Sequence, residues 1–350
     1  MTGQRRARRT PLFATCVPGL GRMLGRQLDA IAGIETAGVG FDGRADLVFF
    51  AADRAARADA LRSRLAEDVF AEIGRADRAG GTGPGRVASM VWRPEAVQRA
   101  LSVWADEVQP LAGSMTFRVV ARVLSETQFL RTDLRQAMTG TIARDRPRWR
   151  LADPARLEVW VSEWHDGQYV AGLRLSGAGM RQHGGRAAER QGALRPTVAA
   201  AMVELAGPPG GLLVDPCCGS GTILAEALAA GWSAEGTDID PEAVAVASRN
   251  AAGARVQLGD ARELMLPDDF AGACVSNLPF GRQFDVPGTW RDWVAAVLAE
   301  MSRVTHSDGA VVLLAPELPE SAVPGSLRLR AKLPIRLLGT AATIWAFRRA

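Results

Sequence analysis

The chain has 350 residues, of which 47% are hydrophobic and 23% are charged, and its formal net charge is +4 at pH 7. This composition is typical of globular proteins, and the length predicts two or three domains. No apolar run approaches the roughly 18 residues of a membrane-spanning helix. The Arg-rich start followed by a broken apolar stretch makes a poor signal peptide, so we expect a cytoplasmic protein with no membrane partner.

The small number of cysteines and histidines, and their spacing, argue against several classes of protein. No C-x-x-C pair is present, the three histidines lack metal-ligand spacing, and no G-x-S-x-G motif occurs. We therefore expect no disulfide framework, no metal site and no triad hydrolysis.

Charge is distributed unevenly along the chain. Residues 1–200 contain 30 Arg against 21 acidic residues, whereas residues 201–350 contain 12 basic against 17 acidic residues. This asymmetry favours a basic region that faces a polyanion and an acidic region with another task.

The predicted elements, in chain order, divide the chain into residues 1–84, 85–178, a linker at 179–192, and 193–350. The first part shows a strand at 46–50 and a helix at 55–65, and a Gly-rich stretch at 80–85 follows. The second part shows helices at 94–107 and 132–143, a strand at 116–123, and a strand pair at 157–162 and 169–175. The third part alternates strands (212–215, 233–237, 255–258, 272–276, 310–314) with helices (222–230, 241–251, 290–304), and two strands follow near 327–333 and 342–347. Such alternation predicts an α/β fold with a doubly wound, mostly parallel sheet.

A Gly-rich loop, Asp215-Pro216-Cys217-Cys218-Gly219-Ser220-Gly221-Thr222, follows the first strand of this third part and opens a helix. Its glycines allow a ligand to approach the backbone closely, and the helix start offers free N–H groups. The loop differs from G-x-G-x-x-G and lacks the lysine of a P-loop. The Asp at the strand end suits a cationic or hydroxylated ligand. The alternative is an ordinary tight turn with packing residues at Cys217 and Cys218, and we favour packing over a catalytic role for both thiols.

Three further acidic residues lie at or just after the ends of the next two predicted strands. Asp238 comes 23 residues after Asp215, near the spacing at which an acidic residue binds ribose hydroxyls, while Asp240 suits the N-cap of the helix that starts at Pro241. Asp260 could bind an adenine amino group or cap the next helix.

The fourth strand ends in Asn277-Leu278-Pro279-Phe280-Gly281. The Asn side chain and a nearby carbonyl can accept hydrogen bonds from one exocyclic amino group, and an aromatic side chain can stack on a flipped base. If such an amino group were methylated, holding its nitrogen lone pair in line with the methyl donor would supply most of the rate. The alternative is a Pro-containing turn.

These motifs together resemble the class I S-adenosylmethionine-dependent methyltransferases. Residues 277–280 resemble the (Asp/Asn)-Pro-Pro-(Tyr/Phe) motif of the enzymes that methylate exocyclic or amide nitrogens, with Leu278 in place of Pro, a variant that also occurs in RNA guanine-N2 enzymes. The resemblance implies that Asn277 and the Pro279 carbonyl orient the amino group and that Phe280 stacks on the base. It implies a cofactor site of Asp215, Cys217, Gly219, Ser220, Gly221, Thr222, Asp238, Ile239, Asp260, Ala261 and Asn277.

The resemblance extends upstream. Residues 13–20 (FATCVPGL) resemble the opening of RNA methyltransferases with a THUMP domain, residues 86–178 have the element order of a THUMP module, and residues 194–197 resemble the start of the helix that leads into their catalytic domain. It implies that an N-terminal ferredoxin-like domain and a THUMP domain grip tRNA, and that a Rossmann-like domain methylates N2 of a guanosine. Ribosomal RNA is the alternative substrate. Protein glutamine or DNA adenine methylation and a non-catalytic RNA-binding role stay open.

An Arg-rich segment agrees with an RNA partner. Residues 118–150 contain eight Arg against three acids, and Arg forks suit phosphate oxygens. We expect RNA contacts from Arg131, Arg135, Arg146, Arg148, Arg150, Arg181 and Arg186. The alternative is a solvated helix face followed by a loop.

Overall fold

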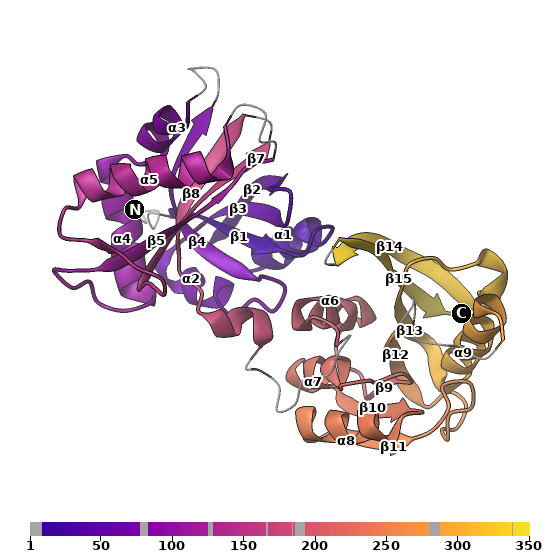
Figure 1. The fold of residues 1–350 in the computed structure, drawn as a ribbon. Coiled ribbons are helices and arrows are strands. Elements are labelled where there is room, and N and C mark those ends of the chain that lie inside the picture. Colours follow the sequence, from indigo (N-terminus) through magenta and orange to yellow (C-terminus); the bar gives the residue numbers. More distant parts are fainter. Residues whose placement is uncertain are drawn as a thin grey trace, which may run out of the picture. The chain divides into compact units, whose positions relative to one another are not determined.

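The computed structural model describes residues 9–77, 83–124, 129–165, 167–183, 185, 193–279, 288–337 and 339–350. The chain forms two compact units, Met1–Met180 and Arg181–Ala350 (Figure 1). The sequence predicts three parts and a linker instead. One sheet runs through the whole first unit, so the predicted boundary between residues 84 and 85 falls inside a unit rather than between two.

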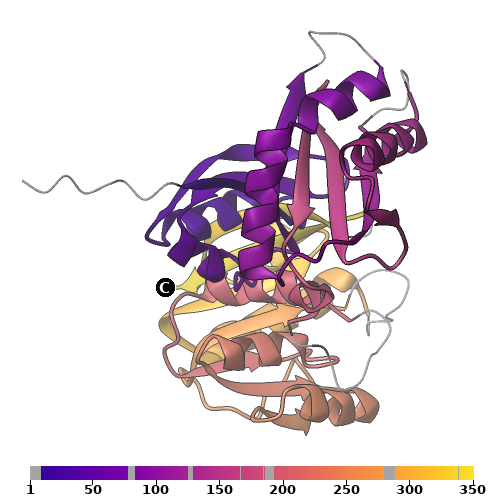
Figure 2. The same cartoon turned by 90° about the vertical axis from the view of Figure 1, so that its left-hand side faces the viewer.

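The described residues of the first unit form a sheet of eight strands in the order β2-β3-β1-β4-β8-β7-β5-β6, together with five helices (Figure 2). The strands are β1 (Thr10–Cys16), β2 (Ile34–Phe41), β3 (Asp46–Ala52), β4 (Asp68–Asp77), β5 (Thr116–Arg122), β6 (Arg150–Leu151), β7 (Leu157–His165) and β8 (Gln168–Arg174). The helices are α1 (Gly21–Asp29), α2 (Arg54–Ala60), α3 (Pro84–Val91), α4 (Pro94–Glu107) and α5 (Arg131–Asp145). Strand β4 joins the two halves of the sheet because it pairs with β1 on one side and with β8 on the other.

An aromatic cluster forms a core on one face of this sheet. The Phe13 and Phe70 rings stack with centroids 4.6 Å apart, and Trp160 lies 5.2 Å from Phe70. At Gly40 on β2, a Cβ atom would lie only 2.4 Å from the Trp164 ring on β7, so this close approach requires glycine. The tryptophans of β7 are therefore core and sheet-face residues.

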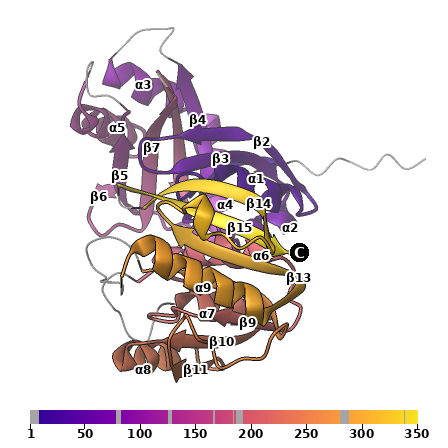
Figure 3. The same cartoon turned by 90° about the vertical axis from the view of Figure 1, so that its right-hand side faces the viewer.

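The second unit has three layers around a seven-stranded sheet in the order β11-β10-β9-β12-β13-β15-β14. Its strands are β9 (Leu212–Asp215), β10 (Ser233–Asp238), β11 (Arg255–Leu258), β12 (Ala271–Asn277), β13 (Thr305–Ala315), β14 (Leu327–Leu337) and β15 (Thr340–Arg349). Helices α6 (Pro196–Ala206), α7 (Thr222–Ala229) and α8 (Pro241–Asn250) cover one face, and α9 (Trp290–Val304) covers the other (Figures 1 and 3). Short 3-10 helices lie at Ala178–Gln182 and Glu320–Ala322.

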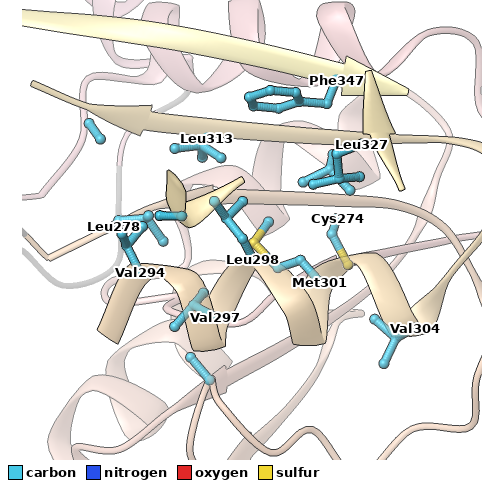
Figure 4. Close-up of a cluster of buried hydrophobic side chains, with 14 of the residues drawn as sticks. Cys274, Leu278, Val294, Val297, Leu298, Met301, Val304, Leu313, Leu327 and Phe347 are labelled. Carbon is cyan, nitrogen blue, oxygen red and sulfur yellow. The ribbon is translucent and has the colours of Figure 1, made fainter. Parts of the chain in front are cut away.

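The predicted doubly wound, mostly parallel sheet is confirmed. Strands β11, β10, β9, β12 and β13 are parallel, and β15 runs antiparallel between β13 and β14. The apolar face of α9 packs on the sheet through Val294, Val297, Leu298 and Met301 (Figure 4). This core fixes β12 and β13, and with them the end of β12 where the candidate site begins.

The elements differ from the predicted ones mainly in the first unit. The predicted helix at 55–65 ends at Ala60, and α3 begins at Pro84, at the end of the predicted Gly-rich linker. None of the described helices is long and apolar enough to cross a membrane. The described residues hold no cluster of His, Cys, Asp and Glu suited to a metal ion.

Candidate active site

The candidate site lies where the winding of the second sheet reverses. Strand β9 has β10 on one side and β12 on the other, and all three run parallel. Their last residues are Asp215, Asp238 and Asn277. The carboxyl ends at such a reversal are the usual ligand site of open α/β sheets. The fold therefore gathers three of the predicted site residues along one edge.

Asp215 is buried, with 1% of its surface exposed. Its Oδ1 accepts hydrogen bonds from the Ser276 hydroxyl at 2.7 Å and from the Cys217 backbone N–H at 3.2 Å. Burial raises the pKa of Asp215 to about 7, against the opposite effect of these two hydrogen bonds, and the nearby Asp238 adds to the rise. Because Ser276 directly precedes Asn277, this bond links the Gly-rich loop to the end of β12.

The loop after Asp215 is shaped by two glycines in the left-handed region, Gly219 (φ 52°) and Gly221 (φ 78°). A Cβ atom at Gly221 would lie 2.9 Å from the backbone Cα of Ala247, so this glycine is needed for packing against α8. A Cβ atom at Gly219 would meet no described atom within 4 Å. The loop is thus tight on its helix side and open at Gly219, where a ligand can approach the backbone.

The predicted cofactor residues Ser220 and Thr222 have buried side chains. Their hydroxyls lie 3.2 Å apart, and the Ser220 carbonyl accepts a hydrogen bond from the Asn250 side chain at 2.9 Å. These contacts hold the loop in shape from its inner side.

The Asp238 carboxylate braces the loop as well. Its Oδ2 accepts a hydrogen bond from the Gly219 N–H at 2.8 Å, and its Oδ1 accepts one from the Asp240 N–H at 3.0 Å. Asp240 itself caps α8 by accepting from the Glu242 N–H at 2.9 Å, so the predicted cap is confirmed. Ile239 between them is 71% exposed and offers an apolar surface beside the loop.

Asp260 follows β11, with Ala261 buried behind it. Its carboxylate accepts hydrogen bonds from the Arg262 guanidinium and from the Arg262 backbone N–H at 2.9 Å. The hydrogen bonds from Arg262 lower the pKa of Asp260, so its carboxylate is ionised and already paired with a cation.

Asn277 ends β12 with an unsatisfied acceptor. Its Oδ1 is buried and has no hydrogen-bond partner among the described residues. The next residue, Leu278, is 1% exposed and packs in the core beneath α9, which accounts for a large apolar residue at this position of the motif (Figure 4). Pro279 is described, whereas Phe280 lies outside the described residues.

The two loop cysteines are poor nucleophiles. Burial, and next to it the charge of Asp215, raises the pKa of both the Cys217 and the Cys218 thiol. A thiol that stays protonated at neutral pH is not activated for attack. The structure thus supports the packing role for this pair.

The predicted RNA-binding arginines fall into separate groups. Arg131 and Arg135 lie in the first half of α5, whereas Arg146, Arg148 and Arg150 follow its end, with Arg148 and Arg150 exposed. Arg146 is partly engaged, because it pairs with Asp145 at 3.1 Å and its guanidinium carbon lies 5.7 Å from the centre of the Trp149 ring. Arg181 is exposed at the start of the second unit, and Arg186 lies outside the described residues.

Sequence reasoning missed one buried polar pair in the second unit. His183 Nδ1 lies 2.8 Å from Glu226 Oε1, and both side chains are at most 5% exposed. The signal was Glu226 itself, a carboxylate inside the apolar helix sequence TILAEALA of α7. The pair fastens the segment before α6 to the helix that follows the Gly-rich loop.

A known protein family matches the part of the chain that carries this site. Residues 183–323 match the family described as "RMKL-like, methyltransferase domain". The U6 snRNA (guanine-N(2))-methyltransferase THUMPD2 of Mus musculus is 37% identical over 134 residues, which cover 35% of this chain and 24% of that protein. The ribosomal RNA large subunit methyltransferase K/L of Cellvibrio japonicus (strain Ueda107) is 29% identical over 230 residues, which cover 61% of this chain and 28% of that protein. The chain thus spans about a quarter of the length of these relatives.

Solved structures resemble the chain along its whole length. TrmN from Thermus thermophilus has a TM-score of 0.73 at 22% identity and covers 97% of this chain and 100% of its own. SMU.472 complexed with SAH has a TM-score of 0.66 at 14% identity and covers 98% of each chain. At these identities the likeness shows the fold, which is Rossmann-like in the second unit. Residues 183–323, which carry the Gly-rich loop, Asp238 and Asn277, are thus the part of the chain that matches the RMKL-like methyltransferase domain family.

Proposed function

We propose that this protein methylates the exocyclic N2 of a guanosine in tRNA, with S-adenosylmethionine as the methyl donor. The observation that carries the proposal is the buried Asn277 Oδ1, which has no partner in the described part of the chain. A buried acceptor without a donor is costly. A substrate amino group would satisfy it, and the Pro279 carbonyl beside it offers a second acceptor.

The strand ends suit the proposed cofactor. When bound, S-adenosylmethionine supplies an electrophilic methyl group on a positively charged sulfur. The acidic residues Asp215 and Asp238 and the open backbone at Gly219 suit a ligand with cationic and hydroxyl groups. Ile239 and Ala261 would contact its apolar parts, and Asp260 would share its carboxylate between Arg262 and an amino group.

The chain's own contribution to the reaction is positioning. Neither the Asn277 amide nor the Pro279 carbonyl takes up a proton at neutral pH, so these groups orient the amino group rather than deprotonate it. Holding the reactants in place is worth several kcal/mol of the barrier. Phe280 would stack on the base, in keeping with the family resemblance.

The choice of tRNA rests on the family resemblance and on the basic first 200 residues. Ribosomal RNA is the second candidate, favoured by the similarity to the methyltransferase K/L of Cellvibrio japonicus. The basic first 200 residues argue against protein glutamine as the substrate. DNA adenine methylation stays a less favoured alternative, which gel shifts with tRNA and duplex DNA would test. The cytoplasmic location stays a prediction.

The test uses the purified protein, radiolabelled S-adenosylmethionine and total RNA that lacks the modification. RNA would be separated by size, digested to nucleosides and chromatographed. Label as N2-methylguanosine in tRNA supports the proposal, and the same nucleoside in ribosomal RNA moves the substrate. No label in any RNA, with cofactor binding shown by calorimetry, overturns it.

A further inference from the structure

The end of the chain carries an unusual charge distribution. Residues 201–320 contain six Arg against 17 acidic residues, whereas residues 321–350 contain six basic residues and no acidic one. Residues 201–320 of the second unit are therefore acidic, whereas its last two strands are basic. Such a reversal within one unit concentrates positive charge on β14 and β15.

The cations on β14 are exposed. Arg328, Arg330, Lys332 and Arg336 all lie on this strand, and β14 is the edge strand of the sheet. The guanidinium groups of the three arginines make no ion pair or hydrogen bond with any described residue, and Lys332 lies over the Trp345 ring at 4.4 Å. In contrast, Arg348 donates to the Asp308 carbonyl and Arg349 pairs with Asp269. The free charge of this region thus lies on β14.

Strand register places these cations relative to the candidate site. Asn277 on β12 pairs with Leu314 on β13, and Leu314 pairs with Ile344 on β15. Ile344 in turn pairs with Leu333 on β14, so these residues form one row across the sheet. Three strand spacings separate Asn277 from Leu333, about 14 Å across the sheet. Strand β14 runs parallel to β12, so Arg336 lies three residues beyond this row, toward the edge at which the candidate site opens. Arg328, Arg330 and Lys332 precede this row and continue the line of cations along β14, away from that edge.

We propose that the exposed edge of β14 binds the phosphodiester backbone of the RNA substrate beside the target nucleotide. The inference rests on the proposed function. A base that enters the site leaves its stack, so the flanking backbone must pass along the rim of the sheet. Guanidinium groups without acidic partners match phosphate oxygens in charge and geometry. Arg330 and Arg336 thus give the second unit an RNA contact of its own.

The opposing explanation is that the cations protect an open sheet edge from pairing with other chains. The two explanations differ in what the loss of charge changes. RNA contacts set the salt dependence of binding, because each phosphate contact releases counterions. Edge protection affects self-association and leaves RNA affinity unchanged.

The test compares Arg330→Gln/Arg336→Gln with the matched control Arg249→Gln/Arg255→Gln. The control removes the same charge from α8 and β11 at the opposite edge of the sheet. Fluorescence anisotropy of an unmodified tRNA transcript would be followed from 50 to 300 mM salt. Loss of two phosphate contacts lowers the slope of log K against log salt by about 1.5 and weakens binding roughly 30-fold at 0.1 M salt. The control should bind nearly as the wild type does.

The inference would be overturned if the β14 variant kept the wild-type RNA affinity and the wild-type slope of log K against log salt. Unchanged RNA binding together with new self-association of the variant would overturn it too and would support protection of the sheet edge. The binding assay needs no methyl transfer, so its outcome is separate from that of the proposed function. A protein that binds RNA through β14 and transfers no methyl group would refute the proposed reaction alone. A β14 variant that methylates with unchanged kcat/KM and affinity would refute this inference alone.

Discussion

Asn277 presents its buried Oδ1 at the end of β12, and we expect its main effect on the reaction. We expect Asn277→Ala to lower kcat/KM by about 100-fold or more, as for the removal of one preorganised hydrogen-bonding group. The affinity for S-adenosylmethionine should fall less than kcat/KM, because the other residues of the predicted cofactor site stay in place. Asn277→Asp keeps an acceptor oxygen and should retain more activity than the alanine variant. Steady-state kinetics measure kcat/KM, and calorimetric titration measures the affinity for the cofactor. Wild-type turnover by Asn277→Ala would contradict the role of Asn277 in orienting the amino group.

Asp215 should make stability depend on pH. Its pKa is about 7 in the folded chain, against an ordinary value of 3.8 for an aspartate side chain, so the folded state favours the protonated carboxyl. This stabilisation is fully present below pH 3.8 and is lost as pH rises through about 7. Between pH 5 and 8 the loss amounts to about 3 kcal/mol.

Asp215→Asn lacks this titration. Its free energy of unfolding relative to the wild type should therefore rise by about 3 kcal/mol from pH 5 to pH 8. Urea unfolding at both pH values measures the change, and Glu317→Gln, at an exposed position, serves as the control. If the free energies of unfolding of Asp215→Asn and the wild type changed in parallel with pH, the Asp215 carboxyl would not be the source of the pH dependence.

At the scale of the element, the loop between β9 and α7 has one glycine for packing and one that leaves the backbone open. Gly221→Ala combines a left-handed φ with a Cβ atom 2.9 Å from the Ala247 Cα, so we expect a loss of about 3 kcal/mol of stability. Gly219→Ala has only the backbone strain, about 1 kcal/mol. Its methyl group projects into the open space, so it should weaken cofactor binding more than folding. Thermal unfolding measures the loss of stability in both variants, and cofactor titration measures the loss of affinity. Equal destabilisation of the two variants would contradict the assignment of Gly221 to packing and of Gly219 to ligand access.

The elements that sequence predicts well are those with local signals. In the second unit, β9, β10 and β12 end in Asp or Asn, and α6 and α8 begin with Pro at their first position, so the β/α alternation can be predicted from the sequence. The Asp240 cap is also local, since its acceptor and donor lie two residues apart. Strand β4 is different, because its partners β1 and β8 lie far away in the sequence and its role depends on the whole sheet.

The same distinction holds for the site. The motifs identify Asp215 and Asn277, because each follows a strand in a recognisable pattern. The bond from Ser276 to Asp215 depends on the register of β12 beside β9, and the pairing of His183 with Glu226 depends on the path of the chain before α6. These contacts join residues 61 and 43 positions apart, beyond the reach of sequence periodicity.

At the scale of the molecule, the predicted division of labour gives the basic first unit the task of holding RNA. We expect Arg148→Gln/Arg150→Gln to weaken tRNA binding and to lower its salt dependence, because exposed Arg side chains release counterions from phosphates. Cofactor affinity should stay unchanged. Arg86→Gln/Arg99→Gln removes the same charge from other exposed positions of this unit and is the control. Equal effects of the two variants on anisotropy titrations would show general charge attraction instead of a defined contact.

The placement of β15 between β13 and β14 has a consequence for assembly during synthesis. Strand β14 leaves the ribosome first, yet its only partner among the described strands is β15, which is made after it. Strand β13 likewise keeps an open edge until β15 arrives. The two strands must therefore join the sheet together as a hairpin, and the methyltransferase unit completes its sheet only when the chain has been made through Arg349.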